Sequence, residues 1–207
     1  FLGKKITPSS DVYLIALTAG MITLLPIVGI FGHHLNMIPQ EVWILVTVAG
    51  LCQAIYFFGL AGAYRNGDLS IAYPVARSFP ILIVMGITFL IGKGDEISLL
   101  AVVGFITVVI SAFFLPMKRL GEIRVRNYIN VMSAFALAAA VGTAGYSLAD
   151  DTALRIMRMP EVLGDHMTVT EISFLYLSFE AIMTVVWVAA FYFGTRARRK
   201  HNSADIT

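Results

Sequence analysis

The sequence predicts an all-α fold, a polytopic bundle of membrane-spanning helices. Hydrophobic residues make up 58% of the 207 positions, charged residues only 14%, and the mean hydropathy is +0.81. Soluble globular domains do not have this composition. The apolar runs are close to the roughly 20 residues that a helix needs to cross about 30 Å of hydrocarbon. The chain is therefore not expected to be a soluble enzyme.

Six apolar segments are predicted to be transmembrane helices. They cover residues 12–31, 42–64, 71–91, 98–116, 128–149 and 172–194. Most connections between them are short and carry turn formers, as in the stretch from Arg65 to Asp68. Only the connection around Arg155 to Thr170 is long. We expect one membrane unit without a separate soluble domain.

Loop charges predict an orientation, because short cytoplasmic loops collect lysine and arginine. One face of the predicted bundle carries eleven of these residues, and the other carries Lys93, Arg155 and Arg158. Both termini are therefore predicted to be cytoplasmic. The basic clusters explain the net charge of +2 as topological anchors at the lipid surface, and no nucleic-acid partner is indicated. The single cysteine, Cys52, cannot form an internal disulfide.

Arg77 is the most informative residue, since it interrupts an apolar run between Pro74 and Pro80. A guanidinium near the bilayer centre costs about 3 kcal/mol or more, so such side chains usually face a bundle interior or a water-filled cavity. The alternative is that Arg77 snorkels back to the basic face. Proline lacks an N–H donor, so both prolines are expected to break the helix and free carbonyls near Arg77. Many membrane prolines are merely compensated kinks.

Several polar side chains are predicted to share the depth of Arg77 and to bind a solute with it. A rise of about 1.5 Å per residue places Tyr73, Gln53 and Tyr56 in the same central slab. The tyrosines, with Tyr146, would offer hydroxyls and ring faces, and Gln53 would offer an amide that both donates and accepts.

Glu180 is the predicted acidic member of this site. It lies within about 8 Å of Arg77 along the membrane normal, whereas Asp150 and Asp151, at the end of segment 128–149, lie about 20 Å away. Glu180 is a candidate for proton coupling, because burial favours the neutral form of a carboxyl group. The alternative is a structural ion pair with Arg77.

No sequence pattern indicates enzymatic chemistry, a cofactor or a metal. The chain has no His-Glu-x-x-His, no Gly-x-Ser-x-Gly and no phosphate-binding glycine loop. The adjacent His33 and His34 could bind a metal, but no third ligand is near them in sequence, which favours a solvated loop pair.

Small residues at helical spacing predict close helix packing. They occur as Gly59-xxx-Ala63 and as Ala134-xxx-Ala138-xxx-Gly142. Such faces pack helices within one chain, and they also leave a homodimer open.

Two segments resemble a known family. The run from Tyr64 to Arg77 is similar to the signature between the third and fourth helices of EamA-like proteins in the drug/metabolite transporter superfamily. The run from Ala144 to Asp151 resembles the sixth helix of the same family. The resemblance implies ten helices in two inverted five-helix repeats, with this chain as a fragment that holds helices two to seven.

The resemblance also implies an organisation and a function. Residues 1–116 would hold the end of helix one and helices two to five, 117–127 a basic loop between the repeats, and 128–207 the first two helices of the second repeat with a basic tail. The family orientation is opposite to the one that the loop charges predict. The expected function is a secondary transporter of a small organic metabolite or drug, working by alternating access in a bacterial inner membrane. The alternative is a scaffold that transports nothing.

Overall fold

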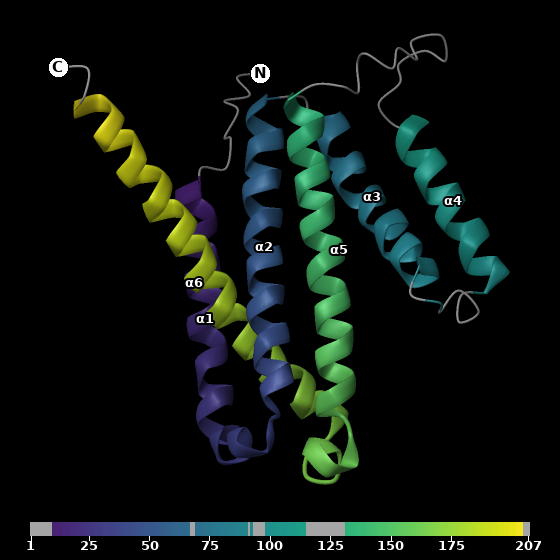
Figure 1. The fold of residues 1–207 in the computed structure, drawn as a ribbon, viewed down its shortest axis with the longest axis vertical. Helices are drawn as coiled ribbons and strands as arrows, with labels where there is room; N and C mark the ends of the chain where they lie inside the picture. The colour runs from purple at the N-terminus through teal and green to yellow at the C-terminus, as the bar shows by residue number, and fades with distance from the viewer. Residues whose placement is uncertain (1–9, 67–68, 91, 93–97, 115–130, 205–207) are drawn as a thin grey trace, which may run out of the picture. The chain divides into compact units, whose positions relative to one another are not determined.

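The computed structural model describes residues 10–66, 69–90, 92, 98–114 and 131–204, with side chains for 12–66, 78–90, 92, 98–111 and 131–195. These residues form six α-helices and no strand (Figure 1), which confirms the all-α prediction. The helices are α1 Ser10–Phe31, α2 Gln40–Asn66, α3 Leu69–Leu90, α4 Leu99–Phe114, α5 Val131–Met157 and α6 Val169–Ala204. Two short turns, the 3-10 helix η1 Gly32–Met37 and the π-helical η4 Pro160–Gly164, lie in the α1–α2 and α5–α6 connections. Each predicted segment thus corresponds to one helix.

Four stretches of the described chain are long and apolar enough to cross a membrane. They are Val12–Met37, Gln40–Asn66, Val131–Met157 and Val169–Thr195, and shorter apolar helices cover Ser78–Leu90 and Leu99–Ser111. Many large apolar side chains point outward, for example Ile15 and Leu100, which are 69% and 83% exposed. An outward apolar surface of this extent is unfavourable in water and suits hydrocarbon. The helices indicate an integral membrane protein.

Local sequence explains where two of the helices begin or end. Thr168 and Glu171 form a capping box before α6, in which Glu171 Oε2 accepts from the Thr168 backbone N–H (2.7 Å) and hydroxyl (2.8 Å). The Thr168 hydroxyl oxygen in turn accepts from the Glu171 N–H at 3.3 Å. At the C-terminal end of α3, Gly92 has φ +77°, a backbone region that glycine enters without steric cost.

The described helices fall into two compact units. The first is built from Ile55–Gly145 and the second from Ser9–Ala54 with Tyr146–Thr207, so α2 and α5 each contribute one segment to both. In the first unit α3 and α4 lie side by side. Its α2 and α5 segments pack closely, because a Cβ at Gly59 would lie 2.6 Å from the Ala139 nitrogen. The predicted role of Gly59 in helix packing is therefore observed.

The packing face of α5 differs from the predicted one. Ala136, Ala139 and Ala140 are fully buried, whereas Ala134 is exposed and Ala138 only half-buried. Gly142 is buried as well. The predicted packing face, through Ala134 and Ala138, is thus not the face that is most buried. Helix α5 carries alanines on several sides, and their spacing alone does not show which side packs against another helix.

Helix α3 continues through both of its prolines. The backbone is helical from Leu69 to Leu90, and Pro80 is buried. The continuous backbone agrees with the alternative of compensated kinks, and the carbonyls that Pro74 and Pro80 were expected to free stay a prediction. Proline removes one N–H donor, but its fixed φ near −65° is itself helical, so neighbouring turns can hold the helix together.

In the second unit α1 packs against α6 (Figure 1), and the Ser178 hydroxyl donates to the Leu24 carbonyl at 3.3 Å. A buried apolar cluster joins the start of α2, the end of α5, η4 and the first turns of α6. Its members are Ile38, Val42, Val46, Ala153, Met157, Leu163, Met167, Ile172, Leu175, Tyr176 and Phe179. This cluster fixes the part of the unit that carries the polar site.

Candidate functional site

A buried polar network joins α2 to α6 in the second unit. The Gln53 amide nitrogen donates to Glu180 Oε1, and the amide oxygen accepts from the Thr184 hydroxyl at 3.1 Å. Glu180 is only 5% exposed and Thr184 only 1%. Both groups are therefore shielded from lipid by protein. Because Glu180 and Thr184 are four residues apart, they share one face of α6, and one amide spans them.

A glycine lets α2 and α6 come close enough for this network. A Cβ at Gly50 would lie 2.7 Å from Met183 Cβ and 3.0 Å from the Thr184 nitrogen. Such distances are shorter than van der Waals contact, so only glycine fits without movement. Gly50 lies one turn before Gln53 and sets the separation that the amide bridges.

Trp187 adds a second polar link between the same helices. Its indole nitrogen donates to the Thr47 carbonyl at 3.1 Å. The Thr47 hydroxyl donates to the Trp43 carbonyl at 2.8 Å. The sequence suggested only packing for Trp187, whereas the structure shows a directed bond that orients α6 against α2.

A second carboxyl lies near Glu180. The Tyr176 hydroxyl donates to Asp150 Oδ1 at 2.6 Å, and Tyr176 is one turn before Glu180 on α6. The predicted distance of Asp150 from Arg77 stays a prediction, because the Arg77 side chain is outside the described residues. Helix α5 continues to Met157, which is fully buried, so Asp150 lies two turns inside it.

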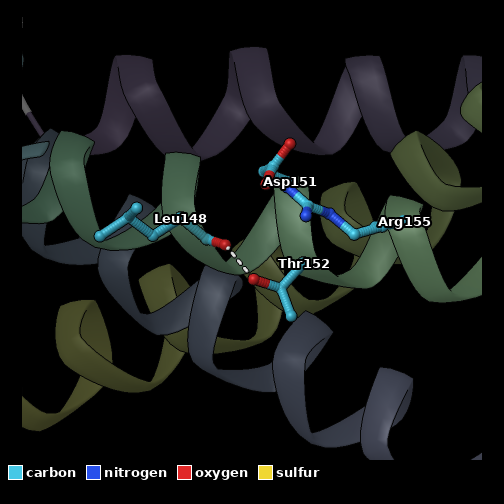
Figure 2. A network of polar contacts seen from close by, with 4 residues as sticks. All are labelled: Leu148, Asp151, Thr152 and Arg155. Atoms are coloured by element: carbon cyan, nitrogen blue, oxygen red, sulfur yellow. Dashed lines mark hydrogen bonds and ion pairs between the residues drawn. The ribbon is translucent and has the colours of Figure 1, made fainter. Parts of the chain in front are cut away.

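Asp151 does not join the site. It forms an exposed ion pair with Arg155 at 3.0 Å, and Thr152 donates to the Leu148 carbonyl at 2.8 Å (Figure 2). The Asp151 and Arg155 side chains are 68% and 57% exposed, so the pair adds little stability. Adjacent aspartates thus have different surroundings, one bonded to Tyr176 and one to an exposed arginine.

The remaining predicted site residues are placed as follows. Tyr146 is half-buried on α5, one turn before Asp150, in the second unit. Tyr56 belongs to the first unit, where it packs beside Leu60 and stands 5.0 Å from the Phe57 ring. The backbones of Tyr73, Pro74 and Arg77 lie in α3, but their side chains are outside the described residues. Their roles, and the ion pair between Arg77 and Glu180, stay predictions.

A third histidine lies beside the predicted pair, contrary to the expectation from sequence. The His34 ring is 4.0 Å from the His33 ring and 6.0 Å from the His166 ring, measured between centroids. Sequence distance hid this neighbour because the fold joins two connections that are more than 100 residues apart. Among the described residues, no three His, Cys, Asp or Glu side chains are arranged to hold a metal ion.

The network can hold a proton or a polar solute group inside the bundle. A charged carboxylate in the bilayer interior costs several kcal/mol unless it is paired or hydrogen-bonded. The described partners of Glu180 and Asp150 are an amide and a phenol. Neutral donors of this kind stabilise a carboxyl group without fixing its charge.

Comparison with known proteins does not extend this description. No family model, curated protein or solved structure matches the chain. The fold and the site define the class of protein: an all-α integral membrane bundle with a shielded polar network between two spanning helices.

Proposed function

We propose that the chain is a membrane carrier for a small organic solute, with Glu180 and Gln53 at its binding site. The observation that supports this is the shielded network of Gln53, Glu180 and Thr184 inside spanning helices. Ionisable groups are expensive in a membrane interior and usually mark solute or proton paths. A shielded polar network between spanning helices therefore supports a carrier.

The proposal also includes the transporter family, the membrane and the transport mechanism. A secondary transporter of the EamA-like type in a bacterial inner membrane, working by alternating access, agrees with the motifs from Tyr64 to Arg77 and from Ala144 to Asp151. In this scheme Arg77 holds an anionic or polar group of the solute or forms a gate with Glu180. Tyr73, Tyr56 and Tyr146 provide further contacts.

Proton movement driven by a solute tests the proposal. The protein is reconstituted into liposomes that enclose a pH-sensitive dye, and a panel of amino acids, sugars, amines and phosphonates is added outside. At least one solute class should change the internal pH, and Glu180→Gln should reduce that rate by at least tenfold. Glu41→Gln is the matched control, because Glu41 is exposed at the first turn of α2.

The scaffold alternative predicts a different outcome. If no solute moves protons and Glu180→Gln only lowers the stability of the bundle, the network serves folding and the carrier proposal fails. Gly59 packs against α5 within the chain. The scaffold alternative uses the two small-residue faces to bind other helices, and the Gly59 face is already occupied by α5 of the same chain.

A further inference from the structure

We propose that His33, His34 and His166, here called the histidine cluster, form a pH-sensitive contact between the α1–α2 and α5–α6 connections. His33 and His34 belong to η1, and His166 follows η4, which is in contact with η1. The cluster lies in one unit and at some distance in sequence from the polar network. The proposal therefore does not depend on transport.

The rings are close enough for protonation to matter. The centroids of His33 and His34 are 4.0 Å apart with an interplanar angle of 43°, and those of His34 and His166 are 6.0 Å apart. His33 and His166 are exposed, and His34 is half-buried. None of the three rings is fully covered by other parts of the chain.

Buried apolar side chains hold the two connections together, and repulsion between protonated rings would act against this contact. Leu163 is fully buried, Met167 is 7% exposed and Ile38 is 6% exposed. Leu35 of η1 packs against this buried group. Separation of the two connections would expose these side chains, so the closed form is held by apolar burial and opposed by charge.

The charges around the cluster decide whether low pH separates the two connections or holds them together. Histidine is the side chain whose charge changes between pH 5 and 8, so acidification from pH 7.5 to 5.5 adds positive charge to the cluster. Glu171 on α6 attracts them, but its carboxylate is bonded to Thr168 at the helix start. Other charged residues in the segments next to the two connections are Glu41 at the start of α2, Asp150, Asp151 and Arg155 in the last turns of α5, and Arg158, Glu161 and Asp165 between α5 and α6.

Repulsion should exceed attraction at low pH. Of the two measured pairs, only His34 and His166, 6.0 Å apart, join the two connections, because His33 and His34 are both in η1. Like charges at this distance repel even in water and shift the separation of the connections by about threefold. Among the described residues there is no arrangement of three metal-binding side chains.

A distance measurement tests the inference. Nitroxide labels are placed at Asn36→Cys and Met159→Cys, which are exposed neutral positions on the two connections, in a Cys52→Ala background. Pulsed electron paramagnetic resonance then gives the distance distribution at pH 7.5 and 5.5. We expect a longer component whose population grows about threefold at pH 5.5.

Two variants make the test decisive. His166→Gln removes the ring that links the connections and should abolish the pH effect, whereas His201→Gln, the fourth histidine of the chain, should retain it. A His33→Gln/His34→Gln variant gives a second check if His166→Gln folds poorly. Identical distributions at both pH values, or an unchanged pH effect in His166→Gln, would overturn the inference.

Discussion

Replacement of Gly50 by alanine should separate α2 from α6 and weaken the polar network. The new Cβ would lie 2.7 Å from Met183 Cβ, 2.8 Å from the Met183 carbonyl carbon and 3.0 Å from the Thr184 nitrogen. Two of these atoms are backbone, so a change of rotamer cannot relieve the contact. Ordinary contact needs about 3.5 Å or more, so the helices must part by roughly 0.5–1 Å.

This movement has two energetic consequences. Overpacking of a close contact costs about 1–3 kcal/mol. The Thr184–Gln53 hydrogen bond, now 3.1 Å, would lengthen beyond normal hydrogen-bond range. Such a bond in a membrane protein contributes about 0.6 kcal/mol on average. Alanine also favours the helix by about 0.5–1 kcal/mol relative to glycine, and this gain must be removed from the comparison.

Gly20→Ala provides that correction. Gly20 is inside α1, and a Cβ there would meet nothing within 4 Å. Both variants gain the same helix propensity, so their difference reports the contact alone. We expect Gly50→Ala to be less stable than Gly20→Ala by about 1–3 kcal/mol.

Reversible unfolding of the purified protein in mixed micelles, with a denaturing detergent as titrant, measures this difference. Helix content followed by circular dichroism gives the free energy of unfolding of each variant. Equal stabilities, within about 0.5 kcal/mol, would refute the assignment of Gly50 as the residue that sets the distance between α2 and α6.

Three further changes test neighbouring contacts. Gln53→Leu leaves the Glu180 carboxyl without its amide donor and should lower stability by about 1–3 kcal/mol in the same unfolding titration; a neutral result would contradict the bond. Thr168→Ala removes the cap of α6 and should cost about 0.5–2 kcal/mol, seen as faster hydrogen exchange in the first turn but not at the middle of the helix. Trp187→Phe keeps the aromatic ring but loses the bond to the Thr47 carbonyl, so it should destabilise by about 0.5–1.5 kcal/mol, and a fully wild-type titration would show that the bond contributes nothing.

The helices were predictable because hydrocarbon imposes a length on each apolar run. Their ends were less predictable. The segment 128–149 was ended before Asp150 and Asp151, since charges usually mark a membrane boundary. In the structure Tyr176 satisfies Asp150 and Arg155 satisfies Asp151. Helix α5 continues for two more turns, and the less exposed of its two aspartates has its partner, Tyr176, on another helix, where the sequence of α5 gives no sign of it.

The site was predictable in depth but not in direction. A rise of 1.5 Å per residue places Gln53 and Glu180 at similar levels, yet it does not say which faces of their helices meet. That choice follows from Gly50, whose missing side chain admits Met183 and Thr184. Asp150 was missed for the same reason, since its link to the site passes through the Tyr176 hydroxyl.

The partner of Glu180 bears on how the site could carry a proton. The sequence offered a structural ion pair with Arg77 as one alternative, and an arginine bound to a carboxylate holds it in the charged form. The Arg77 side chain is outside the described residues. In the structure the donor is the amide of Gln53. An amide N–H can donate to a carboxyl oxygen in either protonation state, and the amide oxygen of Gln53 accepts from the Thr184 hydroxyl. A group that must gain and lose a proton inside a membrane needs a contact of this neutral kind, because a contact that survives both states lets the proton leave without breaking the packing of α2 against α6.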